Sequence, residues 1–192
     1  GDHDEALPAW SPDGRQIAYV TRRGGEPDRH SNFDIYLVEP RAGATERRLT
    51  SFDGADNDPD LESPLSWSPD GRQIAFVQGG EDKWIYYAPH QLAIVDVATG
   101  RTRIPAPIDR WFTQPRWSPD GRSVLALIEQ SRVINLSRIE VASGKVTPLT
   151  TGLRYDAGFA LSKQGRIVVL GGDDVTPYEL AALEQGGLRP LG

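Results

Sequence analysis

Serine followed by Pro-Asp occurs three times in this 192-residue chain, and such serine–aspartate pairs could belong to a nucleophilic catalytic site. The pairs are Ser11 with Asp13, Ser68 with Asp70, and Ser118 with Asp120. All three occur in the same peptide, Ser-Pro-Asp-Gly-Arg, whereas one active site needs its nucleophile only once. An α/β-hydrolase serine also requires the motif Gly-x-Ser-x-Gly, which is absent from this sequence. We therefore expect these residues to be structural.

Histidine and acidic side chains give no further catalytic or metal-binding pattern. His3, His30 and His90 have neither the spacing of a catalytic triad nor that of a His-Glu-x-x-His zinc site. The acidic stretch 56–60 resembles the opening of a calcium loop, but Leu61 and Trp67 stand where such a loop carries glycine and glutamate. A glycine-rich phosphate loop is also missing. We expect no catalytic residue, no metal and no cofactor in this chain.

Arginine and aromatic residues in the longer connections are the remaining functional candidates. Arginine pairs with peptide carboxylates, and aromatic rings hold apolar side chains. The predicted peptide or partner contacts are Arg22, Arg23, Trp84, Tyr86, Tyr87, Arg110, Trp111, Phe112, Arg154 and Tyr155. The alternative is that each of these side chains folds back over its own part of the domain.

An internal repeat determines the expected fold. The peptide Trp-Ser-Pro-Asp-Gly-Arg occurs three times, and a more divergent fourth copy spans 159–167. The turn glycines are Gly14, Gly71, Gly121 and Gly165, at intervals of 57, 50 and 44 residues. Periods of this size are typical of the four-stranded blades of β-propellers.

Each repeat divides into four strand-like pieces separated by turn residues. The sequence predicts an all-β fold, a β-propeller segment over 1–192 with four blades of four antiparallel strands, as part of a larger ring. The expected blades are 7–50, 64–104, 114–150 and 157–191. The segment 178–185 is rich in Leu, Ala and Glu, which favour helix, but its place in the repeat predicts a strand.

The repeated residues have clear structural roles. Proline, aspartate and glycine suit successive positions of a tight hairpin. Trp10, Trp67, Trp117 and Phe159 are expected to wedge between neighbouring blades, where a large aromatic ring buries much apolar area. The long connections are 22–33, 51–63, 78–90, 105–114 and 152–157, and they should gather on one face. That face is where we expect function.

Composition excludes several classes of partner. The net charge of −6 argues against nucleic acid, whose phosphates need a basic surface. Apolar runs are too short to span a membrane, and cysteine is absent, which excludes disulfides and thiolate metal sites. The polar start, residues 1–5, does not resemble a signal peptide; without methionine it is typical of an excised or processed segment.

The Trp-Ser-Pro-Asp-Gly-Arg-x-Ile repeat resembles the PD40 class of propeller repeats. These repeats occur in periplasmic TolB-like proteins and in the propellers of the prolyl oligopeptidase (S9) family of serine peptidases. The insertion 26–36 is similar to one in acylaminoacyl-peptidase-like members, and the uneven repeat intervals suit that family. The segments 173–180 and 187–191 resemble the last stretch before the peptidase domain.

The resemblance implies a non-catalytic propeller portion of an S9-type serine peptidase, gating substrate access and contributing to peptide binding. Its implied partners are a C-terminal α/β-hydrolase domain and peptide substrates, and its implied location is the cytoplasm. Members of the family mostly have seven blades, so four would leave open outer faces. We expect a homo-oligomer sealing those faces, or closure of the four blades on themselves. The alternatives are a TolB-like periplasmic interaction propeller and a lactonase-like propeller enzyme, whose inward metal ligands are not evident.

Overall fold

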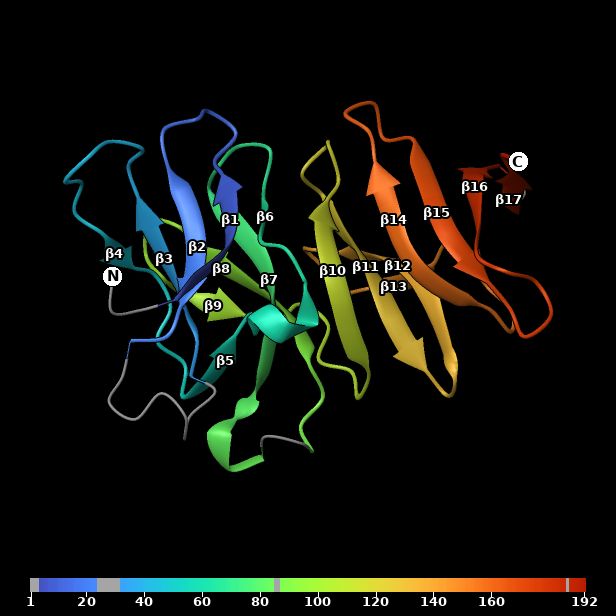
Figure 1. The fold of residues 1–192 in the computed structure, drawn as a ribbon, viewed down its shortest axis with the longest axis horizontal. Coiled ribbons are helices and arrows are strands. Elements are labelled where there is room, and N and C mark those ends of the chain that lie inside the picture. The colour runs from blue at the N-terminus through green and yellow to red at the C-terminus, as the bar shows by residue number, and fades with distance from the viewer. Residues whose placement is uncertain (1–3, 24–31, 85–86, 186) are drawn as a thin grey trace.

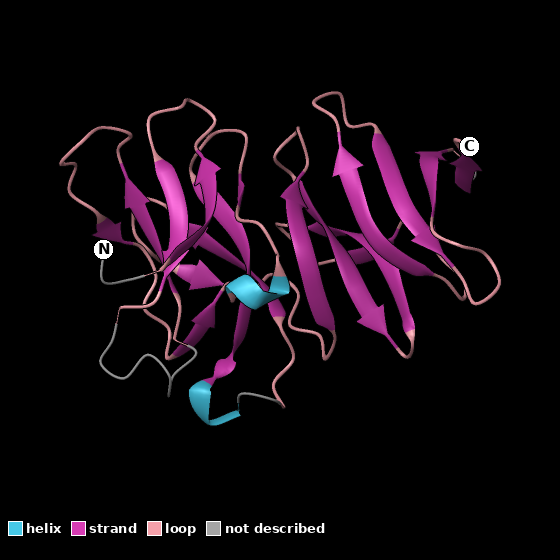
Figure 2. Cartoon of the chain, in the orientation of Figure 1, coloured by secondary structure: helices cyan, strands magenta, loops and turns pink. Residues whose placement is uncertain are grey.

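The computed structural model describes residues 4–23, 32–84, 87–185 and 187–192. Over these residues Figure 2 shows an all-β fold with short 3₁₀ turns, η2 (Pro59–Leu61) and η3 (Asp82–Trp84). None of the described helical segments is long and apolar enough to cross a membrane. The all-β fold predicted from the repeat is confirmed.

The strands form four antiparallel meanders, or blades, that follow one another along the chain (Figure 1). Blade 1 consists of β1 (Glu5–Trp10), β2 (Ile17–Thr21), β3 (Asp34–Val38) and β4 (Arg47–Arg48). Blade 2 consists of β5 (Gly54–Asp56), β6 (Ser66–Trp67), β7 (Gln73–Glu81), β8 (Gln91–Asp96) and β9 (Thr102–Arg103). Blade 3 consists of β10 (Trp111–Trp117), β11 (Ser123–Gln130), β12 (Val133–Glu140) and β13 (Val146–Pro148). Blade 4 consists of β14 (Tyr155–Leu161), β15 (Ile167–Gly172), β16 (Glu179–Glu184) and β17 (Gly187–Pro190).

Blades 3 and 4 are joined at one point into a larger sheet. The join is a single parallel pair, Ile134 with Tyr155, between β12 and the start of β14. The remaining edge of β12 pairs with β13, over Ser137 to Ile139, so the two meanders separate immediately. The segment of high helical propensity forms β16, because it pairs with β15 on one side and β17 on the other.

The first strand of each blade begins earlier than the sequence pattern indicates. Pairing starts at Glu5, Gly54, Trp111 and Tyr155, upstream of the expected blade starts. In every blade the register shifts a few residues later, and Leu7 and Gln114 adopt positive φ angles of 51° and 53° at two of these shifts. A bulge breaks the alternation of inward and outward side chains, which hides the upstream half of the strand from a sequence pattern.

The repeated Ser-Pro-Asp-Gly peptides form the hairpins between the first and second strands. In blade 1 the Gly14 N–H donates to the Ser11 carbonyl oxygen at 2.9 Å, and Gly14 has a φ of 69°. The Ser11 hydroxyl donates to Asp13 Oδ1 at 2.7 Å and accepts from the Gln16 N–H at 2.9 Å. Blades 2 and 3 repeat this arrangement. Serine and aspartate therefore serve the turn, as the sequence predicts.

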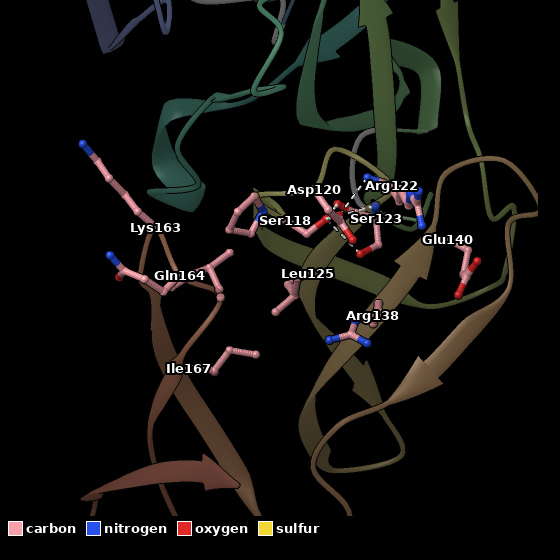
Figure 3. A pocket seen from close by; sticks show the side chains of 13 residues that line it. Ser118, Asp120, Arg122, Ser123, Leu125, Arg138, Glu140, Lys163, Gln164 and Ile167 are labelled. Carbon is pink, nitrogen blue, oxygen red and sulfur yellow. Dashed lines mark hydrogen bonds between the residues drawn. The ribbon is translucent and has the colours of Figure 1, made fainter. Parts of the chain in front are cut away.

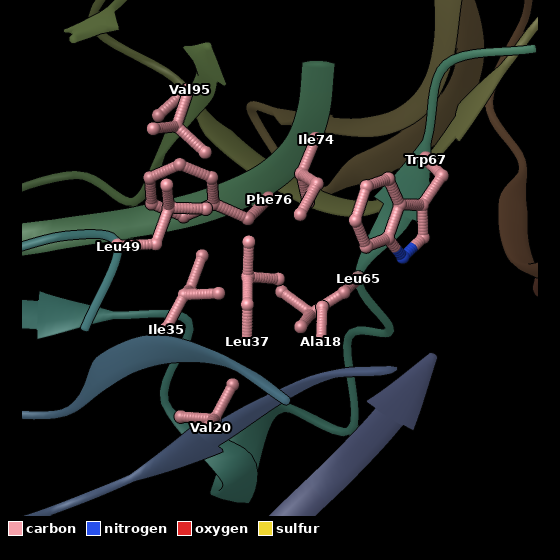
Figure 4. Close-up of a cluster of buried hydrophobic side chains, with 11 residues drawn as sticks. Ala18, Val20, Ile35, Leu37, Leu49, Leu65, Trp67, Ile74, Phe76 and Val95 are labelled. Carbon is pink, nitrogen blue, oxygen red and sulfur yellow. The ribbon is translucent and has the colours of Figure 1, made fainter. Parts of the chain in front are cut away.

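Three apolar clusters lie between successive blades and form the core. The first joins Val20 and Ile35 of blade 1 to Ile74 and Phe76 of blade 2 (Figure 4). The second lies between blades 2 and 3 around Phe112, and the third lies between blades 3 and 4. Sheets packed face to face in this order are the arrangement of a propeller.

Tryptophan wedges hold the first two interfaces together. Trp67 belongs to the first cluster, and its Nε1–H donates to the carbonyl oxygen of Ala9 in blade 1 at 3.1 Å. Trp117 is buried in the second cluster with blade 2 residues. Trp10 is 59% exposed, because the described residues place no blade against that side. Each wedge therefore points toward the preceding blade.

The prediction that Phe159 occupies the tryptophan position of blade 4 is wrong. Leu161 pairs with Ile167 as Trp67 pairs with Ile74, so leucine occupies the tryptophan position. The hairpin of blade 4 has one residue fewer between its serine and the following isoleucine than the hairpins of blades 1 and 2. Aligning the repeats on their aromatic residues therefore puts Phe159 in the wrong position. Phe159 lies two residues upstream and still packs against the third cluster.

The four blades lie in an open row. Blade 1 and blade 4 stand at opposite ends of the row in Figure 1. The expectation that the four blades close on themselves is therefore wrong. Each interface uses one face of each sheet, which leaves the outer faces of the first and fourth blades uncovered by the rest of the described chain.

Candidate partner-binding face

Where the structure describes them, the connections between second and third strands and between successive blades lie on one face of the row, at the lower edge of Figure 1. We call this the loop face, and the opposite one, with the Ser-Pro-Asp-Gly turns, the hairpin face. Large apolar side chains are exposed on the loop face in blades 2, 3 and 4. They are Trp84, Tyr87, Trp111, Leu153, Tyr155, Val175 and Tyr178. Such a concentration of exposed aromatic residues is typical of binding surfaces.

Trp111 is held in place by blade 2. Its ring lies 4.2 Å from that of His90, centroid to centroid, with the planes tilted by 42°. The next residue, Phe112, donates its N–H to the His90 carbonyl oxygen at 2.9 Å. Burial lowers the pKa of the half-buried His90, so the imidazole is neutral at pH 7. The exposed indole of Trp111 is thus held against an uncharged imidazole ring.

Tyr155 and Tyr178 form a second exposed aromatic group on blade 4. Their rings are stacked, with 5.9 Å between centroids and 11° between planes. Tyr155 starts the first strand of the blade and Tyr178 precedes the third, so each comes from the strand end that faces the loops. A rigid aromatic pair offers contact area at a small cost in side-chain entropy.

Several predicted contact residues turn out to be internal. Phe112 is fully buried in the second cluster and belongs to the core, because bulged strand β10 turns it inward. Arg23 lies 4.5 Å above the Tyr36 ring and pairs with Glu46 at 2.5 Å. Arg154 pairs with buried Asp156 at 2.6 Å. These side chains stabilise the blades.

The other predicted residues divide between the surface and local contacts. Trp84, Tyr87, Trp111 and Tyr155 are exposed on the loop face. Arg22 lies 5.0 Å from the Phe33 ring centre, Arg110 is half-buried, and Tyr86 lies outside the described residues. The exposed residues that the sequence analysis missed are Leu153, Val175 and Tyr178.

Two buried aspartates fix the loops that carry these residues. Asp156 accepts hydrogen bonds from the Thr150 hydroxyl and, at 3.0 Å, from the Leu136 N–H of the preceding blade. Asp56 is the equivalent residue in blade 2, six positions after Thr50 as Asp156 follows Thr150. The repeated spacing Leu-Thr-x5-Asp is the signal in the sequence that marks this pair.

The two aspartates differ in how their charge is balanced. In blade 4, Arg154 neutralises Asp156. The residue paired with Asp156 on the neighbouring strand is Gly171, and a side chain at that position would collide with the Arg154 guanidinium. In blade 2, Gly54 stands at the position of Arg154, and Gln78 replaces Gly171 and donates to Asp56 at 2.8 Å. Burial raises the pKa of Asp56 to about 6, although the hydrogen bond from Gln78 opposes the shift.

The described part of the chain holds no group of three His, Cys, Asp or Glu residues arranged for a metal ion. A hollow of about 530 Å³ lies on the hairpin face, between blades 3 and 4. The loop face instead presents exposed aromatic rings on a rigid support. That arrangement can bind apolar groups of a partner.

Comparison with known proteins identifies the repeat. The family model of the TolB β-propeller domain (PD40) matches residues 3–169. Dipeptidyl-peptidase 5 of Porphyromonas gingivalis is 30% identical over 156 residues, which are 80% of this chain and 22% of that protein. The Tol-Pal system protein TolB of Francisella tularensis is 30% identical over 210 residues, covering 87% of this chain and 45% of TolB.

Solved structures agree on the fold. The acylaminoacyl peptidase of Pyrococcus horikoshii superposes with a TM-score of 0.72 at 20% identity, over 100% of this chain and 27% of that one. This chain thus spans less than half of each of these relatives, and it is similar to the propeller domains of S9 peptidases as well as to TolB. The chain belongs to the TolB β-propeller (PD40) family.

Proposed function

We propose that this chain is the non-catalytic propeller portion of an S9-type serine peptidase, where it gates substrate access and contributes to peptide binding. The observation that carries the proposal is the similarity to dipeptidyl-peptidase 5 across 80% of the chain. The loop face supports it: Trp84, Trp111 and the Tyr155–Tyr178 stack are suited to a hydrolase domain and to apolar peptide side chains.

The proposal includes a C-terminal α/β-hydrolase domain of the parent protein as the partner of the loop face, and the cytoplasm as its location. Peptide substrates would pass between the two. The outer faces of blades 1 and 4 would be covered by further blades, or by a second copy when the chain is alone. Exposed Leu170 and Leu180 on blade 4 make an uncovered face unfavourable in water.

The experiment is to read the gene that encodes the chain and to assay its products. We expect a hydrolase domain with Gly-x-Ser-x-Gly in the same reading frame. The complete product should cleave chromogenic dipeptide substrates in a manner sensitive to serine-directed inhibitors, and the 192-residue chain should not. A purified chain that cleaves these substrates by itself, with that inhibitor sensitivity, would contradict the proposal.

A second candidate is a periplasmic interaction propeller of the TolB type. It is favoured by the 30% identity to TolB over 87% of this chain. The same gene distinguishes the two: a signal peptide and a small α/β domain upstream, with no hydrolase downstream, would assign the loop face to a protein partner instead.

A further inference from the structure

The interface between blades 3 and 4 departs from the other two in a coordinated way. Leu161 occupies the tryptophan position of blade 4. The side chain that faces this position from the preceding blade is also different. Leu37 in blade 1 and Ile94 in blade 2 are buried beside the wedges Trp67 and Trp117, whereas the matching residue in blade 3 is Arg138.

These two changes leave a groove at the hairpin end of this interface, beside the third cluster, and it is larger than the hollow of about 290 Å³ beside Trp67 at the first interface. The groove has a volume of about 530 Å³ and opens beside the hairpins of both blades. Leu125, Leu161 and Ile167 form its apolar part, and Figure 3 shows Leu125 and Ile167 directed into the space between the blades. Arg138 lies on the blade 3 wall next to Leu125, its partner across the strand pair.

Arg138 is available for an added ligand. Its exposed guanidinium makes no hydrogen bond or ion pair with any of the described residues, although Asp120 lies near enough for the positive charge of Arg138 to contribute to lowering the pKa of that carboxyl group. Of the two acidic residues that line the groove, Asp120 is bound within its own hairpin by the Ser118 hydroxyl at 2.5 Å. Glu140 lies at the far side of Arg138, two residues along the strand. Together with Arg122 and Lys163, Arg138 gives the groove three cations against two carboxylates.

We propose that this groove binds a carboxylate attached to an apolar group, as at the C-terminal residue of a peptide that ends in leucine. The planar guanidinium of Arg138 receives the carboxylate through two parallel hydrogen bonds. The apolar side chain takes the space that a tryptophan fills at the other interfaces, against Leu125 and Leu161. The site is on the hairpin face and is independent of the partner proposed for the loop face.

The test is calorimetric titration of the full chain with three probes: acetyl-glycyl-leucine, its C-terminal amide, and 4-methylpentanoate. We expect the free acid to bind and the amide to bind more weakly by about tenfold or more, because the charge-assisted pair is lost. Binding of 4-methylpentanoate as well would assign recognition to the carboxylate and the apolar group alone. Binding of the peptide only would add its main chain to the recognised chemistry.

Two variants test the groove itself, with circular dichroism to verify folding. Arg138→Leu restores the residue type of Leu37 and removes the cation, and Leu161→Trp restores the wedge and fills the space. Each should weaken binding by about tenfold or more, whereas Arg41→Leu, an exposed position on blade 1, should leave it unchanged. Equal binding of the acid and the amide, no binding of either carboxylate, or unchanged binding by folded Leu161→Trp would overturn the proposal.

Discussion

Replacing Trp67 by alanine is expected to lower the free energy of unfolding by about 3–5 kcal/mol, the usual cost of removing a large aromatic side chain from a core. Trp67 is 9% exposed, packs in the cluster between blades 1 and 2, and donates its Nε1–H to Ala9. The variant loses this contact between blades and opens a cavity beside Ile74 and Leu65. Urea unfolding followed by far-UV circular dichroism measures the change.

Trp10 provides a matched control within the same chain. The same hairpin sequence, Ser-Pro-Asp-Gly-Arg-Gln-Ile, follows it, but it is 59% exposed. Trp10→Ala should change the free energy of unfolding by no more than about 0.5 kcal/mol, as is usual at exposed positions. Equal costs for the two substitutions would show that the tryptophans do not act as wedges toward the preceding blade.

Asp56→Asn is expected to stabilise the protein at pH 8. It should also remove the part of the pH dependence of the free energy of unfolding that Asp56 causes in the unsubstituted chain. The carboxyl group of Asp56 is fully buried without a cation beside it, and its pKa is raised to about 6. The folded state therefore binds a proton more tightly than the unfolded state, whose aspartates titrate near pH 4. Stability from this group is present below about pH 4 and is lost as the pH rises to about 6, by on the order of 3 kcal/mol.

The measurement is the free energy of unfolding of both proteins at several pH values from 4 to 8. The difference in free energy of unfolding between the variant and the unsubstituted chain isolates the effect of Asp56, because the other titrating groups are common to both. We expect the difference to grow in favour of asparagine as the pH rises. Gln78 can still donate to the amide oxygen of asparagine, so the fold should be retained.

Asp156→Asn is the control, and it should have the opposite effect. Asp156 pairs with Arg154, so the substitution leaves a partly buried guanidinium without its counter-ion. It should destabilise the chain at pH 8 by about 2 kcal/mol, the usual size for a hydrogen bond to a charged group. Stabilisation by both substitutions, or by neither, would contradict our account of the two sites.

The sequence predicts the blade order well because the Ser-Pro-Asp-Gly hairpins are set by local chemistry. Proline, a serine hydroxyl and a glycine with positive φ determine each turn within a few residues. The place of β16 in the repeat, rather than its own residues, predicts it correctly as a strand against its helical propensity. Strand starts were predicted less well, because the bulges at Leu7 and Gln114 interrupt the alternation that marks a strand.

The candidate site was only partly predictable, because burial depends on the neighbouring blade. Trp111 and Phe112 are adjacent aromatic residues, yet one is exposed beside His90 and the other is at the centre of a core. Arg154 is a plausible surface arginine until Asp156 is seen beneath it. The leucine at the tryptophan position of blade 4 was not recognised, because Phe159, two residues upstream, is the aromatic residue nearest to that position in the sequence.

Hydrogen–deuterium exchange on this chain, alone and mixed with the hydrolase domain that we propose as its partner, is the sharpest test of the loop face as a binding surface. We expect added protection on the loop face, in the peptides that contain Tyr87, Trp111, Tyr155 and Tyr178. Protection confined to the hairpins at 11–16, 68–73 and 118–123, or no change on any blade, would contradict it.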